Sequence, residues 1–204
     1  MPDPDVYLQQ SDEVLVAWSQ AGDCNAFGHI AQRYQTILLR FVRRNFSVGI
    51  DPEDVVQETF LKAFENLARY RTGRLVRTWL FTITFRVAVS HSRRRRSGLK
   101  LLAQFAGQAA IAVPPDCDTH QDELRKLWDD AAQLLTPTQF RAMWLLFVEE
   151  MGRNQIAAIL GKTRTTTKLV LYRAQCKLRT HYGVKIATGT HITQTTKIID
   201  GVHS

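Results

Sequence analysis

The chain has 204 residues, of which 45% are hydrophobic and 23% are charged, enough apolar surface for one domain or two small ones and too much for a disordered protein. Lysine and arginine outnumber aspartate and glutamate by 27 to 19, and the net charge of +8 points to an anionic partner such as nucleic acid. Because Cys24, Cys117 and Cys176 form no CxxC pair and the six histidines lack ligand spacing, we expect neither disulfides nor a metal site.

The chain also lacks the usual signals for export or membrane insertion. No apolar run follows basic residues at the N-terminus, and no run of about 18 apolar residues is present. We therefore expect a soluble cytoplasmic protein without a membrane span and without a cofactor.

Helical periodicity dominates the sequence and strand alternation is almost absent, which predicts an all-α fold. The first predicted helix runs from about Ser11, its N-cap, to Ala21, and Gly22-Asp23 ends it. The second runs from about Cys24 to Phe46 with an apolar stripe along its length.

The third predicted helix carries a cluster of carboxylates, although the chain as a whole is basic. Asp51 can serve as N-cap with Pro52 at the first helical position. The residues expected in its buried stripe are Val56, Phe60, Phe64 and Leu67. On the polar side, Glu53 stacks with Gln57 and Asp54 with Glu58, which leaves these four free for a partner. A capped, solvated helix is the simpler account of such a turn taken by itself.

The fourth predicted helix begins near Leu75, carries Trp79 inward as a core residue, and ends in the basic run Ser92 to Arg96. These helices predict one compact domain over residues 11–96. Residues 97–122 break the helical pattern and predict a flexible, partly extended linker.

Helical spacing returns at about Glu123, and Thr136-Pro137-Thr138-Gln139 forms a capping box for a helix that ends near Met151. A predicted helix-turn-helix follows, in which Gly161 permits the turn and Thr163 caps the second helix. The outward residues of that helix suit phosphates and major-groove base edges: Arg164, Thr165, Thr166, Lys168, Leu169, Arg173 and Lys177. An ordinary helical hairpin with a basic solvated face is the alternative.

Taken together, the ordered motifs resemble the extracytoplasmic-function (ECF) group of bacterial sigma-70 family sigma factors. In the first half the marks are Gln20-Ala21-Gly22-Asp23, the acidic run Asp51 to Phe64, and Arg77-Thr78-Trp79-Leu80. In the second half they are Leu135-Thr136-Pro137 and Tyr172-Arg173-Ala174. Residues 11–96 resemble region 2 and residues 123–182 region 4, so the implied fold is two small helical domains joined by the linker. Residues 183–204 form a tail of unknown role.

The resemblance implies a promoter-specificity subunit that is not an enzyme and that starts transcription of a stress- or signal-responsive regulon with core RNA polymerase. It also implies control by an anti-sigma factor. The acidic helix would dock on the clamp of the largest polymerase subunit through Asp51, Glu53, Asp54, Gln57 and Glu58. Region 4 would place the outward residues above in the minus-thirty-five major groove.

The resemblance further implies that region 2 holds the melted minus-ten strand. The residues expected there are Asn66, Arg69, Tyr70, Arg71, Arg74, Arg77, Arg86, Arg93, Arg94, Arg95 and Arg96. The arginines offer charge for phosphates, and Tyr70 offers a stacking face for an unstacked base.

Two departures from the family pattern leave the promoter sequence open. Phe85-Arg86 stands where the family usually has an Arg-Asn pair, and the run Arg164 to Val170 only partly matches the usual recognition helix. A helix-turn-helix regulator that acts without core polymerase is the alternative function, although it leaves the acidic helix without a purpose. An enzyme acting on nucleic acid is disfavoured because the sequence has no P-loop, metal-ligand cluster or site-like pair of carboxylates.

Overall fold

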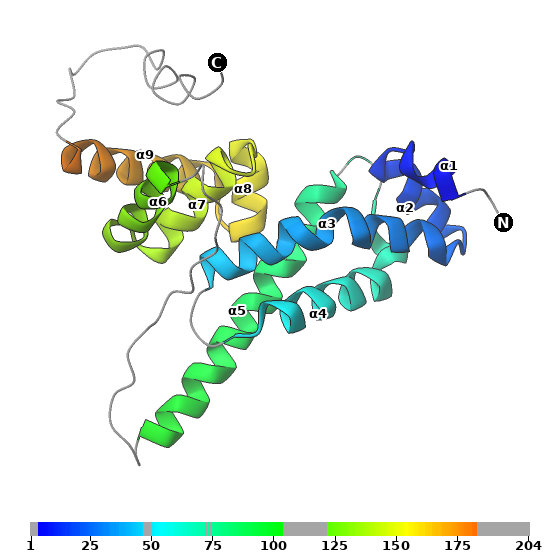
Figure 1. Ribbon diagram of the computed structural model, residues 1–204, viewed down its shortest axis with the longest axis horizontal. Coiled ribbons are helices and arrows are strands. Elements are labelled where there is room, and N and C mark those ends of the chain that lie inside the picture. The colour runs from blue at the N-terminus through cyan, green and yellow to red at the C-terminus, as the bar shows by residue number, and fades with distance from the viewer. Residues whose placement is uncertain (1–3, 47–49, 72, 74, 104–121, 183–204) are drawn as a thin grey trace, which may run out of the picture.

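The computed structural model describes residues 4–46, 50–71, 73, 75–103 and 122–182, and every regular element in these ranges is helical (Figure 1). The prediction of an all-α fold is therefore confirmed. The first half contains α1 (Pro4–Leu8), α2 (Asp12–Gln20), α3 (Cys24–Asn45), α4 (Pro52–Glu65), the 3-10 turn η1 (Leu67–Arg69) and α5 (Val76–Ala103). The second half contains α6 (Asp122–Leu134), α7 (Pro137–Phe147), α8 (Arg153–Leu160) and α9 (Arg164–His181).

The predicted N-caps start their helices as expected. Ser11 accepts a hydrogen bond from the Val14 backbone at 3.4 Å, and Thr163 accepts one from the Thr166 backbone at 3.1 Å. Thr136 and Gln139 complete the capping box of α7. Each such cap satisfies backbone donors that the helix leaves unpaired and contributes about 1 kcal/mol.

The first domain is a bundle in which α3 and α4 pack against α5. Phe41 of α3 and Phe81 of α5 are fully buried with ring centroids 5.1 Å apart, and Leu38 and Leu80 are buried beside them. Side chains of this size each stabilise the fold by roughly 1.5–3 kcal/mol when they leave water. The core thus fixes the positions of α4 and α5, which carry most of the site residues predicted for the first domain.

The second domain packs α7, α8 and α9 around an aromatic cluster. Trp128 of α6 lies 5.6 Å from Phe140 and 5.1 Å from Trp144 between ring centroids. Leu145 and Ile156 of the same domain are fully buried. This core holds the helix-turn-helix pair α8 and α9.

Three predictions about the helices are wrong. The fourth helix continues to Ala103, so the first seven residues of the predicted linker are helical, because the leucines and lysine there favour helix enough to offset about 1 kcal/mol for Gly98. Conversely, α7 stops at Phe147, four residues early, since Glu150 adopts a left-handed φ of 50°. The third wrong prediction concerns Phe64, which the sequence places in the buried stripe of its helix. Phe64 is 46% exposed and packs against the Phe27 ring at the edge of the α4 core face.

Several expectations fall outside the described residues: the rest of the linker, 104–121, which includes Cys117, and the tail 183–204. Cys24 and Cys176 are free thiols. In the part of the chain that the structure covers, no helix is long and apolar enough to cross a membrane, and no cluster of three or more His, Cys, Asp or Glu side chains could hold a metal.

Candidate functional site

The outward face of α4 mixes acidic, polar and apolar side chains. Asp54 and Gln57 are exposed, as expected. Leu61 at 59% exposure and Phe64 continue the same face at helical spacing, and sequence reasoning missed both as surface residues. We call Asp54, Gln57, Leu61 and Phe64 the α4 strip. A row of exposed apolar groups bordered by polar ones is typical of a protein-binding surface.

The remaining acidic residues of α4 have partners within the chain. Asp51 accepts hydrogen bonds from the backbone N–H groups of Glu53 and Asp54, which lower the pKa of its carboxyl group. Glu53 pairs with Arg43 at 2.5 Å, with both side chains about half exposed. Glu58 is only 26% exposed and pairs with Lys62, so the expectation that all four polar residues are free is wrong for Glu53 and Glu58.

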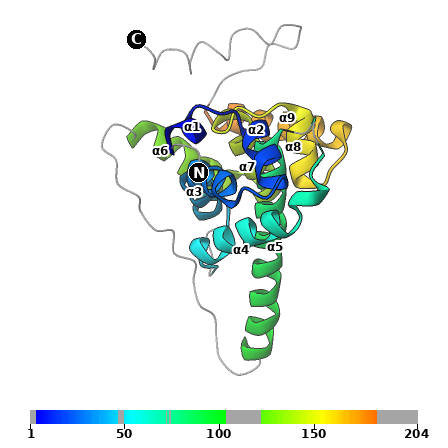
Figure 2. The same cartoon turned by 90° about the vertical axis from the view of Figure 1, so that its right-hand side faces the viewer.

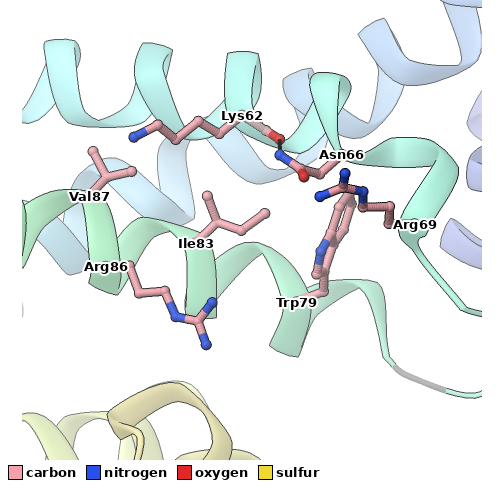
Figure 3. A pocket seen from close by; sticks show the side chains of 7 residues that line it. All are labelled: Lys62, Asn66, Arg69, Trp79, Ile83, Arg86 and Val87. Carbon is pink, nitrogen blue, oxygen red and sulfur yellow. Dashed lines mark hydrogen bonds between the residues drawn. The ribbon is translucent and has the colours of Figure 1, made fainter.

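A cavity of about 390 Å³ lies between α4, η1 and α5 (Figure 3). Its lining residues are Lys62, Asn66, Arg69, Trp79, Ile83, Arg86 and Val87. The Asn66 amide donates a hydrogen bond to the Lys62 carbonyl at 2.8 Å, which leaves the Asn66 side-chain oxygen available to the cavity. Three cationic groups, one amide oxygen and one indole therefore surround a single open space.

The expected roles of Tyr70 and Trp79 are exchanged in the structure. Tyr70 is 7% exposed and its ring packs against Trp79 with centroids 4.9 Å apart, so the expectation that Tyr70 offers a stacking face is wrong. Burial also raises the pKa of the Tyr70 hydroxyl. Trp79 was expected in the core and does pack against it, but the half-buried indole also lines the cavity.

The side-chain amide of Gln20 donates to the Leu67 and Tyr70 carbonyls and so holds the η1 turn against α2.

The predicted minus-ten arginines do not form one cluster. Arg69 and Arg86 line the cavity. Arg71, two residues after Arg69 in the sequence, is exposed. Arg86 and Arg93 are two helical turns apart and share one face of α5, whereas Arg77 is half a turn out of phase with Arg86 and faces the second domain.

The other arginines of this set lie near the end of α5 or outside the description. Arg93, Arg94 and Arg95 are exposed. Both views show this end of α5 projecting beyond the other helices (Figure 1 and Figure 2). Arg74 and the side chain of Arg96 lie outside the described residues.

The helix-turn-helix geometry agrees with the sequence expectation. Gly161 has a φ of 62°, which turns the chain from α8 into α9. Leu171 and Ala174 are buried and hold α9 in place. Thr167 is also buried, and its hydroxyl donates to the Thr163 carbonyl at 3.0 Å.

The face of α9 that points away from α8 is fully accessible. All seven of the predicted outward residues are exposed: Arg164, Thr165, Thr166, Lys168, Leu169, Arg173 and Lys177. Tyr172, 61% exposed, extends this face and was missed. Its place three residues after Leu169 was the available signal.

Comparison with known proteins identifies the family. A family model for sigma-70 region 2 matches residues 30–98. The ECF RNA polymerase sigma-E factor of Salmonella typhimurium is 30% identical over 176 residues, which are 82% of this chain and 92% of that protein. The sigma-E factor of Haemophilus influenzae is 28% identical over 82% of this chain and 93% of its own length. For the ECF sigma factor BldN of Streptomyces coelicolor, the match is 27% identical and spans 78% of this chain but 61% of BldN.

Two solved structures share the fold. One is CnrH in complex with the cytosolic domain of CnrY, with a TM-score of 0.59 and 24% identity over 87% of this chain and 100% of that one. The other is the sigma factor RpoE with the anti-sigma factor NepR from Bartonella quintana, with a TM-score of 0.59 and 23% identity over 76% and 97%. With a relative at 30% identity along most of both sequences, this chain belongs to the ECF RNA polymerase sigma factors of the sigma-70 family.

Proposed function

We propose that region 2, residues 11–96, binds core RNA polymerase and holds the melted minus-ten strand. Region 4, residues 123–182, then binds the minus-thirty-five element. The observation that carries this proposal is the position of α4. One side of the helix presents the α4 strip, and its C-terminal turn supplies Lys62 and Asn66 to the cationic cavity. A single helix thus couples a protein-binding face to a site for an anionic ligand.

The cavity has the chemistry that a melted strand needs. Lys62, Arg69 and Arg86 can neutralise phosphates around its rim, and Trp79 offers an aromatic face on which an unpaired base can stack. The Asn66 oxygen accepts a hydrogen bond and can discriminate between base edges. Tyr70 supports the Trp79 ring from beneath and does not contact the strand.

The α4 strip fits a docking site for the clamp of the largest polymerase subunit. Its apolar members can be buried by a partner helix, and Asp54 gives charge complementarity to a basic partner. Glu53 and Glu58 contribute by holding the helix in place through their internal ion pairs.

Region 4 fits a recognition helix in the major groove. Lys168 and Arg173 lie on the exposed face of α9 and suit phosphates, while Arg164 and Thr165 at its N-terminal end suit base edges. Leu169, 45% exposed between them, suits the methyl group of a thymine.

We extend anti-sigma control to this chain because RpoE, which shares its fold, is described as bound to an anti-sigma factor. An anti-sigma factor that covers the α4 strip would keep the chain from core polymerase. The chain itself would act in the cytoplasm and catalyse no reaction, because RNA synthesis belongs to the core enzyme.

Run-off transcription with purified core polymerase tests the function. We expect discrete transcripts from a subset of genomic promoter fragments only when both the chain and core polymerase are present. Promoter binding by the chain alone, with no transcript in the presence of core polymerase, would instead favour the helix-turn-helix regulator. Family membership argues against that outcome.

A further inference from the structure

One motif of the sequence has no role in the proposed function: Gln20-Ala21-Gly22-Asp23, which ends α2 and starts α3. The fold fixes this motif at its far end. Gly22 has a φ of 103°, which lets the chain turn, and the Asp23 carboxylate caps α3 by accepting hydrogen bonds from backbone N–H groups of its first turn. Gln20, the last residue of α2, is therefore held at a defined place.

The Gln20 side chain reaches the η1 turn, which lies 47 to 50 residues later in the sequence. Its amide nitrogen donates to the Leu67 carbonyl at 2.8 Å and to the Tyr70 carbonyl at 3.1 Å. Leu67 is the first residue of η1 and Tyr70 is its C-cap, so one amide group holds both ends of the turn. A glutamine suits this position because its NH2 group carries two donors.

The η1 turn has few other means of keeping its orientation. It comprises three residues, and among the described residues no side-chain hydrogen bond caps its N-terminal end. So short a 3-10 helix gains little stability from its own hydrogen bonds. Leu67 and Tyr70 are buried, but apolar packing has no preferred direction, whereas a hydrogen bond does. The two bonds from Gln20 therefore set how the turn is rotated.

Two parts of the cavity depend on the orientation of this turn. Arg69, which lines the cavity, stands in the sequence between the two carbonyls that Gln20 holds (Figure 3). Trp79, which also lines the cavity, packs with its ring centroid 4.9 Å from that of Tyr70. Gln20 itself is not among the described residues that line the cavity. Its effect on a ligand there is exerted through Arg69 and Trp79.

We propose that Gln20 is a positioning residue for the strand site. By fixing η1, its amide directs the Arg69 guanidinium toward a strand phosphate and supports the Tyr70 ring against Trp79, on which a base stacks. This inference rests on the proposed function, because it takes the cavity to hold the melted minus-ten strand. It also gives a function to the motif that begins at Gln20.

Gln20→Met tests the proposal, because methionine is uncharged and unbranched like glutamine but cannot donate hydrogen bonds from its side chain. Gln20 is exposed, so we expect the variant to fold. Gln32→Met, at an exposed position of α3, is the matched control. Gln20→Glu, which keeps the shape of the side chain and loses both donors, is a second variant, with Gln32→Glu as the control for its charge.

The measurement is the affinity of the full chain, assembled with core polymerase, for a fluorescent single strand of about 12 nucleotides at several salt concentrations. Core polymerase alone gives the baseline. We expect Gln20→Met to weaken binding about fivefold and to reduce the salt slope by about 0.7, the contribution of one phosphate contact on a single strand, as Arg69→Ala does. Gln32→Met should change neither quantity.

The salt slope separates positioning from a general loss of structure. A partly unfolded variant would bind more weakly by the same factor at every salt concentration and would keep the slope of the natural chain. The double variant Gln20→Met with Arg69→Ala should show the slope of Arg69→Ala alone, because both changes remove the same contact. An unchanged slope for Gln20→Met, or slope losses that add in the double variant, would overturn the proposal.

The result is separable from the proposed function. If the cavity does not hold the strand, Arg69→Ala will leave both the strand affinity and the salt slope unchanged. If only the role of Gln20 is wrong, Arg69→Ala will reduce the slope and Gln20→Met will not.

Discussion

Glu58 of α4 and His91 of α5 are joined by a hydrogen bond of 2.6 Å, which ties together the two helices that border the cavity. The same carboxylate pairs with Lys62 at 2.5 Å. Hydrogen bonds from His91 and Lys62 lower the pKa of Glu58 from its ordinary 4.5 to about 2. Glu58 therefore links α4, which carries the α4 strip, to α5.

The Glu58 contacts make the free energy of unfolding depend on acid pH. Because the pKa of Glu58 is lower in the folded chain than in the unfolded one, the ionised carboxylate stabilises the fold above about pH 4.5, and this is lost as the pH falls toward 2. With solvent screening we expect Glu58→Gln to lower the free energy of unfolding by about 1 kcal/mol at pH 7 and by much less at pH 3. Urea denaturation at the two pH values measures this. Glu65→Gln, at an exposed position on the same helix, should change neither value, and an equal loss at both pH values for Glu58→Gln would contradict the account.

Reversing the charge on the α4 strip should weaken attachment to core polymerase without unfolding the chain. Asp54→Arg is expected to cost about 2 kcal/mol of binding free energy, because the new arginine would face a basic partner and like charges at an interface repel, while an exposed charge adds little to stability. The affinity is measured by letting each variant compete with the natural chain for fluorescently labelled core polymerase. Glu13→Arg on α2 reverses an exposed charge away from the strip and should bind as the natural chain does. Unchanged competition by Asp54→Arg would remove the strip from the polymerase interface.

Arg86 should influence which minus-ten sequences are used. Arginine only donates hydrogen bonds, whereas asparagine also accepts, so Arg86→Asn is expected to change base preference at one or two positions of a randomised minus-ten library. Arg86→Lys keeps the charge and serves as the control for phosphate contact alone. Transcripts sequenced from the library decide the matter: a uniform loss with the order of sequences preserved would leave Arg86 with an electrostatic role only.

Leu169 should read a thymine methyl group in the minus-thirty-five element. Replacing thymine with uracil removes that methyl, and we expect about fourfold weaker binding by the natural chain, from roughly 0.8 kcal/mol per buried carbon group. Leu169→Ser should bind the two duplexes equally. Lys168→Ala should weaken both alike and reduce the salt dependence by about one unit. Fluorescence anisotropy with the duplexes measures the affinities, and a uracil penalty retained by Leu169→Ser would assign the contact to another residue.

Local sequence signals predicted local structure well. Asp51, Thr136 and Thr163 start their helices as expected, because a cap depends on residues within one turn. The end of α5 was harder to place, since a single Gly98 in a run of helix-forming residues has a small cost that its neighbours offset.

Side-chain roles that depend on packing could not be read in the same way. Tyr70 and Trp79 are both aromatic and nine residues apart, and only the packing of the Tyr70 ring against Trp79 of α5 decides which ring lines the cavity. Glu149 looks like one of two ordinary acidic residues at a helix end, yet it is buried by arginines from two distant helices. Such contacts arise from the tertiary arrangement, on which helical periodicity carries no information.

The length of α5 has a mechanical consequence. As one helix of 28 residues it extends about 42 Å at 1.5 Å per residue, and the part from Arg77, which contacts Glu149, past the cavity to Arg93 is about 24 Å long. Arg86 and Arg93 are therefore held about 10 Å apart along a single stiff rod. A strand that reaches both meets anchor points of constant spacing, so its path is set by the geometry of the helix, whatever its sequence.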